Sequence, residues 1–247
     1  DQSVYERLFN LSNVCVLPSE DQEGRKSCHN VERIVSELYT EENNPKVLGI
    51  RDKDYTVFNT TYQKPNNIFL TDDRDLEMML FKAPSVVTGL GMWHSDFSIN
   101  VIESINICRY IGYLRIYNEL NQCDCKFQRS LTKISLVWDY DTQAVIHDYK
   151  LNLFAKFQQS SKKPVTKEAL QSFIAEINLE NFSSYEICQG HDVCRLLRAM
   201  MKSPPYNEQK RLFDKMVNSY SQTDFHRTQL YDDIINWFHQ RGIDKVI

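Results

Sequence analysis

Apolar and polar residues in the first hundred positions follow two alternating periods. Residues 2–10 and 27–39 place apolar side chains at helical spacing, which predicts two amphipathic helices, the second with Ser27 as its N-cap. Three short and nearly continuous apolar runs predict buried strands over 13–17, 46–51 and 67–71. Because helices alternate with buried strands, we expect an α/β fold in which helices cover both faces of a parallel sheet.

After Pro84 the composition shifts: Ser85 to Met92, with two glycines, is predicted to be a short linker, and the pattern beyond it is mainly helical. Helices are predicted over 100–121, 166–177, 191–202, 206–219 and 224–241. The stretch 132–157 fits both strand-like and helical patterns, and the sequence does not decide between them. We therefore place a soft domain boundary near residue 95, between an α/β core over 1–95 and a mainly helical C-terminal region over 96–247.

Two of the predicted strands end in clustered carboxylates. Asp52 and Asp54 follow the first, and Asp72, Asp73, Asp75 and Glu77 follow the second. Side chains two apart on an extended chain lie on the same face, so Asp52 and Asp54 can reach one cation while Lys53 points away. Carboxylates suit Mg²⁺, and ligands bind beyond the carboxyl ends of parallel strands. We predict a site for one or two Mg²⁺ ions here.

The acidic residues and the loop between them also allow structural roles. On spacing alone, Asp52 and Asp54 fit a metal site or a solvated acidic turn equally well. Asp75 and Glu77 either bind metal or, like Asp72 and Asp73, start a helix, where carboxylates cap free N–H groups. The aromatic side chains of the loop over 55–66 either stack on substrate bases or pack over the sheet edge. These side chains are Tyr55, Phe58 and Tyr62.

A second feature is a helix with one cationic face. Basic side chains fall within a narrow arc of the helix predicted over 191–202, opposite an apolar face. They are His191, Arg195, Arg198 and Lys202. Cations on successive turns either track a phosphate backbone or form an ordinary solvated face. Alternatively, His191 forms a hydrogen bond near the metal site without binding the metal itself. Asp192 is a candidate N-cap.

Composition places the chain among ordinary globular proteins and argues against a membrane protein. Of 247 residues, 42% are apolar and 25% charged, with a net charge of −4. There is no run of about 18 apolar residues and no basic-then-apolar leader, so we expect a cytoplasmic protein without membrane contact. Seven scattered cysteines, with Cys123 and Cys125 as the single close pair, favour reduced thiols.

The acidic segments resemble the Toprim nuclease domain. Val47 to Asp54, Asn67 to Asp72 and Asp75 to Glu77 are similar to its metal-binding motifs, and nearest to AriB-type nucleases of the PARIS phage-defence system, which are relatives of the overcoming-lysogenization-defect nucleases. In that family a strand ending in V-E-G-x-x-D precedes the first helix, and Asp1 resembles the last residue of that motif. We expect its glutamate upstream of Asp1, because the chain begins with Asp rather than Met. A later Gly190-His191-Asp192 also resembles the family.

The resemblance implies a Mg²⁺-dependent nuclease that acts as a toxic effector in phage defence. Asp52, Asp54 and Asp1 would be catalytic, and Asp52, Asp54, Asp75 and Glu77 would bind metal. AriB-type proteins imply cleavage of transfer RNA, whereas the wider group implies nicking of DNA. The resemblance also implies an ABC- or AAA-type ATPase that restrains the nuclease. Because no G-x-x-x-x-G-K-[ST] occurs in this chain, that ATPase is expected as a separate chain.

Two further expectations concern partners. The alternative to a nuclease is that the chain is a non-catalytic binding subunit of the ATPase complex. The sequence also does not decide whether the chain forms a homodimer. An apolar stripe in the helix predicted over 224–241 either docks on the ATPase or packs on the protein's own core. The stripe consists of Phe225, Leu230, Tyr231, Ile234, Trp237 and Phe238.

Overall fold

The computed structural model describes residues 2–20, 28–59, 61–127, 133–201, 209–243 and 246. Asp1, Ser27 and Lys202, three residues with predicted roles, lie outside these ranges. No helix in the described ranges is long and apolar enough to cross a membrane.

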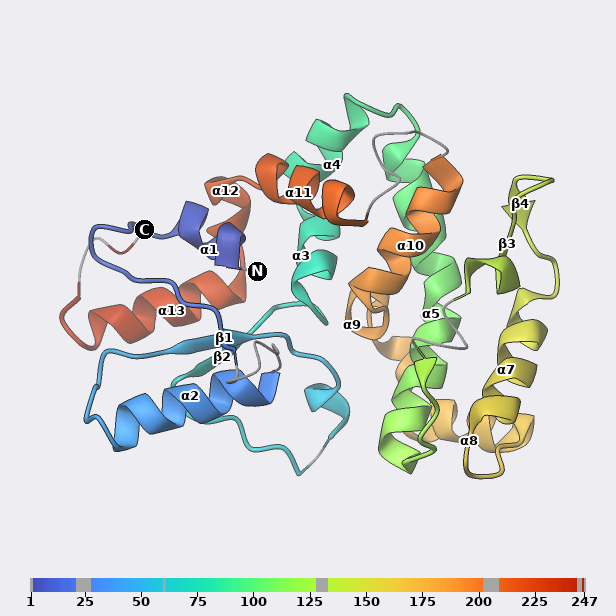
Figure 1. Ribbon diagram of the computed structural model, residues 1–247, viewed down its shortest axis with the longest axis horizontal. Helices are drawn as coiled ribbons and strands as arrows, with labels where there is room; N and C mark the ends of the chain where they lie inside the picture. The colour runs from blue at the N-terminus through green and yellow to red at the C-terminus, as the bar shows by residue number, and fades with distance from the viewer. Residues whose placement is uncertain are drawn as a thin grey trace.

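A short parallel sheet lies between helices. Strand β1 (Gly49–Arg51) pairs in parallel with β2 (Ile68–Leu70), with Gly49 opposite Ile68 and Arg51 opposite Leu70. Helix α2 (Cys28–Thr40) covers one face and α13 (Gln229–His239) the other (Figure 1). A Cβ on Gly49 would come within 2.6 Å of Val31 Cγ1, so α2 packs directly on β1. These elements confirm the parallel pairing and the helices on both faces.

The sheet is smaller than predicted. The apolar run over 13–17 forms no strand: residues 14–19 have no regular structure, and Leu17 is exposed. Val14 and Val16 pack against the core outside any strand, so their apolar pattern reflects burial alone. Within the described residues the parallel sheet has two strands, which supports a mixed α/β fold but does not confirm a Toprim-like one.

Helices after the sheet form the larger part of the molecule. Helix α3 (Leu76–Lys82) leads into α4 (Pro84–Gly91) and then into the long α5 (Phe97–Asn121). The linker predicted over 85–92 is therefore wrong, because this segment forms a helix that buries Val86 and Leu90. Helix α10 (Gly190–Met201) and the short α9 (Ser184–Ile187) pack on α5. A Cβ on Gly112 would come within 2.5 Å of the carbonyl oxygen of Ile187, so α5 and α9 are in close contact. The first helix, α1 (Gln2–Leu8), confirms the predicted opening helix.

The stretch that the sequence left undecided contains helical and strand segments in turn. Its described part holds a 3₁₀ turn η2 (Ile134–Leu136), an antiparallel pair of strands β3 (Trp138–Asp139) and β4 (Ala144–Val145), and the start of α7 (Tyr149–Ser160). The remaining elements are the 3₁₀ turns η1 (Thr56–Phe58) and η3 (Leu179–Asn181) and the helices α8 (Lys167–Glu176), α11 (Gln209–Ser219) and α12 (Gln222–Phe225). The helix predicted over 224–241 is divided, because Thr228 caps the start of α13.

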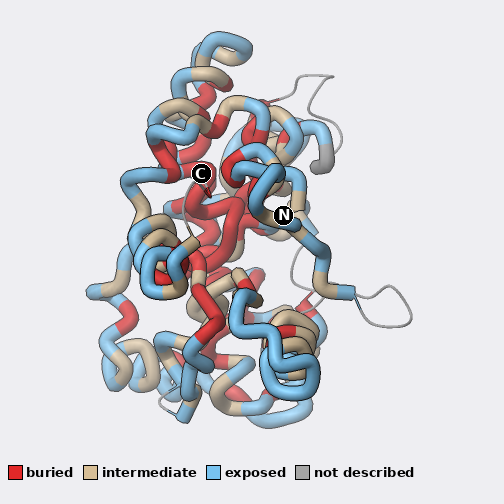
Figure 2. Tube along the Cα trace, turned by 90° about the vertical axis from the view of Figure 1, so that its left-hand side faces the viewer, coloured by how far each residue is buried: buried red, intermediate tan, exposed pale blue. Residues whose placement is uncertain are grey.

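One hydrophobic core runs through the molecule on both sides of residue 95. It joins residues from Val4 to Val246, and Figure 2 shows the buried segments meeting in the interior. The apolar stripe predicted to dock on a partner belongs to this core. Leu230 and Ile234 are buried, and Phe225 packs edge-on against Phe9. Its prediction as an exposed docking surface is wrong, because the apolar face of α13 covers β2.

Candidate functional site

The two acidic clusters meet at the carboxyl ends of β1 and β2. Asp52 follows β1, and its Oδ1 accepts a hydrogen bond from the N–H of Leu76 at 3.1 Å. The N–H of Asp54 donates to the carbonyl of Arg74 at 2.8 Å. These bonds tie the loop after β1 to the loop after β2. As a result, Asp52 lies beside Asp75 and Glu77, which flank Leu76 in sequence.

Asp75 joins the start of α3 to the start of α10. Its Oδ1 accepts from the N–H of Met78 at 3.0 Å, which makes it the N-cap of α3, as one of the two interpretations predicted. Its Oδ2 accepts from the N–H of Gly190 at 2.8 Å. A Cβ on Gly190 would lie 2.3 Å from Glu77 Cβ, so only glycine permits this approach. The Gly190-His191 sequence thus has a steric role at the acidic site.

Glu77 faces His191 across the same junction. Its Oε1 lies 3.0 Å from His191 Nδ1. Burial opposes the charge on Glu77, but the hydrogen bond and the positive charge of His191 outweigh burial and lower the pKa of Glu77. The hydrogen bond to Glu77 raises the pKa of His191 although its burial acts in the opposite direction. His191 therefore contacts the acidic cluster. This agrees with the second interpretation of His191, in which it lies next to the predicted metal site rather than on a phosphate backbone.

Carboxylates crowd one another in this site. Burial first, and then the charges of Asp75, Glu77 and Asp54, raise the pKa of Asp52 to about 7. Burial and the charge of Glu77 likewise raise the pKa of Asp75 to about 7, although Arg74 and two backbone N–H groups act against the rise. Like charges in a poorly solvated place are relieved by a proton or by a cation. The cluster therefore has the electrostatics of a cation site.

Asp54 is not placed as its spacing predicted. The strand ends at Arg51, and Asp54 has φ 48°, in the left-handed region, so the alternation of an extended strand does not reach it. Its Oδ2 lies 3.8 Å from Arg51 Nη2. Burial raises its pKa, while Arg74 and Arg51 act in the opposite direction. The prediction that Asp52 and Asp54 lie on the same face of an extended strand is therefore wrong. Asp54 stands beside the cluster and pairs with Arg51.

The other two aspartates support the fold. The carboxylate of Asp72 accepts from the N–H groups of Gln229 and Leu230, each at 2.8 Å, and so caps α13 from a distant part of the chain. Asp73 is buried and pairs with Lys82 at 3.0 Å. The prediction that Asp72 caps the start of a helix is confirmed, but that helix is α13 and not α3, which follows Asp72 in sequence.

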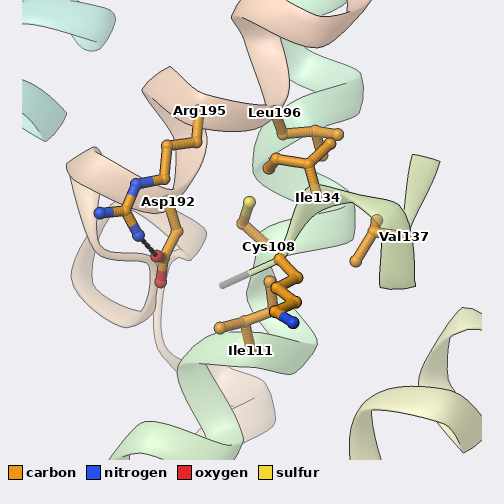
Figure 3. Close-up of a pocket in the computed structure, with 8 residues that line it drawn as sticks. Cys108, Ile111, Ile134, Val137, Asp192, Arg195 and Leu196 are labelled. Atoms are coloured by element: carbon orange, nitrogen blue, oxygen red, sulfur yellow. Dashed lines mark ion pairs between the residues drawn. The ribbon is translucent and has the colours of Figure 1, made fainter. Parts of the chain in front are cut away.

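The cationic face of α10 is partly engaged within the protein. Arg195 turns toward Asp192 (Figure 3), with Nη1 at 4.0 Å from Oδ1. Asp192 is buried and accepts from Arg115 Nε at 2.7 Å and Nη2 at 3.0 Å, so it forms an ion pair with α5. Its predicted role as an N-cap is wrong, because α10 already begins at Gly190. Arg198 is partly buried, and Lys202 lies outside the described residues. Contact of this face with nucleic acid stays a prediction.

The aromatic loop packs on the protein. Tyr55 lies under the Arg74 guanidinium, 3.8 Å from ring centroid to Cζ, and Phe58 meets Phe182 edge-on with ring centroids 4.8 Å apart. The Tyr62 hydroxyl donates to Glu32 at 2.7 Å. Packing, the second of the two interpretations, therefore accounts for all three side chains. Arg74 was missed by sequence reasoning, although an arginine between Asp73 and Asp75 was the available signal.

The carboxylates of the cluster are the type of ligand that Mg²⁺ prefers, but they do not form a complete set of protein ligands. No group of three histidine, cysteine or acidic side chains within the described ranges is arranged to hold a metal ion. Mg²⁺, however, is usually held by one or two carboxylates together with water and substrate phosphate. Asp52 and Glu77 each keep one carboxylate oxygen outside the bonds described above, and these two oxygens would hold such an ion.

Two hollows lie near the site. The first, between α5, α10 and η2, measures about 10 Å³, room for about one water molecule (Figure 3). The second is an open groove of about 390 Å³ between Tyr55 and the last turns of α5. Only the second is large enough for a small ligand.

Comparison with family models, with curated proteins and with solved structures found no match to this chain.

Proposed function

We propose that the chain is a Mg²⁺-dependent nuclease with its site at Asp52, Asp75 and Glu77. The carrying observation is the hydrogen bond from Leu76 N–H to Asp52, which joins two acidic loops at the carboxyl ends of parallel strands. The crowding that raises the pKa of Asp52 supports it, because a bound cation relieves that repulsion. The resemblance to Toprim nucleases implies metal ligands at Asp52, Asp75 and Glu77, together with Asp54.

Each residue has a distinct part in the proposed reaction. Bound Mg²⁺ supplies a polarised phosphoryl oxygen and an acidified water. Asp52 and Glu77 hold the ion, and Asp75 fixes the start of α3 so that Glu77 stays in place. His191 is exposed at the edge of the cluster and holds at Nε2 the proton that the leaving oxygen needs. Asp54 is a further ligand once its ion pair with Arg51 opens.

The substrate and the partner come from the resemblance. We take transfer RNA as the first substrate, as the AriB-type nucleases imply, with DNA nicking as the alternative. An unrestrained nuclease is toxic to its own cell, so an ATPase chain that holds it inactive belongs to the same proposal. Its docking surface lies elsewhere than on the apolar stripe of α13, which is buried.

The test compares cleavage of labelled transfer RNA and supercoiled DNA, with Mg²⁺ or with chelator. Asp52→Asn is expected to lower the rate by more than about 100-fold, since even residues that merely support a metal ligand are worth about 10–100-fold. Asp141→Asn, an exposed aspartate outside the site, is the control and should cleave like the wild type. Absence of Mg²⁺-dependent cleavage of both nucleic acids would overturn the proposal.

A non-catalytic binding subunit is the second candidate, and the hydrogen bonding of Asp75 favours it. Both of its oxygens already accept backbone N–H groups, as expected of a residue that joins elements. In that case wild type and Asp52→Asn are equally inert toward nucleic acid, while tagged full-length protein still recovers an ATPase from cells. Recovery of the chain alone would exclude this candidate.

A further inference from the structure

The open groove beside the acidic site has the lining of a base-binding pocket. Tyr55 forms one side, and α5 supplies Arg115, Asn118 and Glu119 on the other. Its volume, about 390 Å³, is within the range of small-ligand sites. The loop with η1 reaches from the sheet to the lower half of α5 (Figure 1), and Tyr55 packs beside Ile116 there. One side of the groove is thus built by the same loop that carries Asp52 and Asp54.

The groove combines planar side chains with side chains that can form hydrogen bonds. Tyr55 and the Arg115 guanidinium are planar, and Arg115 itself lies over the Phe127 ring at 4.6 Å. Asn118 uses its amide oxygen to accept from the N–H of Cys125 at 2.8 Å, which leaves the amide NH₂ as a donor. Glu119 is exposed and offers a carboxylate acceptor. Planar groups that stack, beside an adjacent donor and acceptor, are the features that recognise an unpaired nucleobase.

Consecutive residues connect the groove to the acidic cluster on both of its sides. On α10, His191 contacts Glu77 of the cluster, and the next residue, Asp192, holds Arg115 of the groove. On the other side, Asp54 stands beside the cluster, and the next residue, Tyr55, lines the groove. Cluster and groove are therefore built on consecutive residues of the same two segments.

We infer that the groove binds a base of single-stranded nucleic acid next to the phosphate that is cleaved, an inference that rests on and deepens the proposed nuclease function. Asn118 and Glu119 read the edge of that base by donating and accepting hydrogen bonds. Arg115 holds its face, and Tyr55, whose ring packs under Arg74, closes one side of the groove. Selection at the groove would thus favour unpaired loops over duplex, because a paired base has its edge already occupied.

The test measures binding in chelator, where cleavage plays no part. Affinities are determined by calorimetry for the four ribonucleoside 5′-monophosphates and for ribose 5-phosphate, which lacks a base. The variant Asn118→Asp with Glu119→Gln exchanges donor and acceptor at unchanged net charge and keeps the oxygen that accepts from Cys125. The control, Glu103→Gln, alters an exposed glutamate on α5 outside the groove. Thermal melts confirm that all proteins are folded.

Wild type is expected to bind its preferred nucleotide about tenfold more tightly than ribose 5-phosphate, the effect of about 1.4 kcal/mol. The double exchange should lose that preference or transfer it to another base, whereas Glu103→Gln keeps it. Equal binding of all five compounds, or a double exchange that behaves like Glu103→Gln, overturns the inference. Loss of nuclease function is judged separately by Asp52→Asn in the cleavage assay, so the two failures are distinguishable.

Discussion

Asp52 is held in a place where its charge is unfavourable. The folded pKa is about 7 against an ordinary value of 3.8, so the folded state binds a proton more readily than the unfolded state between these values. Stability contributed by this group is therefore lost as the pH rises from about 4 to 7, and it stays lower above pH 7. A residue that costs stability in its functional form is typical of a binding site rather than of a purely structural one.

Asp52→Asn tests this cost directly. Asparagine keeps an oxygen that accepts from Leu76 but carries no charge, so we expect the variant to be more stable than the wild type at pH 8 by about 1 kcal/mol. For a chain of this size that raises the Tm by about 2–4 °C. The advantage should shrink as the pH falls from 7 toward 4. Thermal melts at several pH values measure it, with Asp141→Asn as the matched control, and an equal Tm at pH 8 would contradict it.

Gly190 is the second residue on which the site depends. Gly190→Ala places a methyl group 2.3 Å from Glu77 Cβ and 2.6 Å from Asp75 Oδ1, which forces α10 away from α3. We expect a loss of about 1–3 kcal/mol, as for other overpacked contacts. Gly91→Ala is the control, since its Cβ would meet nothing within 4 Å. Chemical denaturation measures both, and equal midpoints for the two variants would show that the junction is loose.

At the scale of elements, helix starts converge on the loop after β2. Asp75 caps α3 and binds the first N–H of α10, while Asp72 caps α13. Three helices that are far apart in sequence thus begin beside one short acidic loop. Their N-terminal N–H groups stabilise the carboxylates, and the carboxylates in turn satisfy donors that have no partner within a helix.

Asp72→Ala removes a cap that joins residues more than 150 positions apart. The N–H groups of Gln229 and Leu230 lose their acceptor, so we expect a destabilisation of about 1 kcal/mol. Asp96→Ala is the control, because Asp96 stands at the start of α5 without a capping hydrogen bond. Hydrogen exchange should show faster opening at the start of α13 in Asp72→Ala alone. Unchanged exchange there would mean that Thr228 caps the helix sufficiently by itself.

At the scale of the whole molecule, the acidic site lies where the small sheet meets the helical part. The sheet supplies Asp52, α3 supplies Glu77, and α10 supplies His191. A ligand that binds at this junction couples to the stability of both parts, because it contacts elements from each. Global unfolding is therefore an appropriate measure of binding.

Mg²⁺ is expected to raise the Tm of the wild type at pH 8. At ten times the dissociation constant the gain is about 1.4 kcal/mol, and removal with chelator should reverse it. Asp52→Asn should show little or no response, since it loses a carboxylate ligand. Ca²⁺ serves as a comparison ion with the same charge, and equal responses of wild type and variant to Mg²⁺ would argue against metal binding at Asp52.

The sequence by itself determined most of the long helices and the parallel pairing. Apolar spacing over 27–39 reflects burial of one face of α2, whereas the many apolar residues over 100–121 reflect a helix that is buried on several sides, and both constraints are local to each element. It also placed Asp52 at the end of a strand and Asp75 at the start of a helix. Both positions follow from neighbouring residues, so both were accessible without the fold.

Only the tertiary structure decided how those pieces meet. That Asp72 caps α13, that Arg115 neutralises Asp192, and that the α13 stripe is buried all depend on contacts between distant segments. An apolar helix face looks the same in sequence whether it covers β2 or binds a partner. A carboxylate likewise looks the same whether it meets a cation or a helix start. Packing between elements distinguishes them, because burial and pairing are properties of the assembled fold.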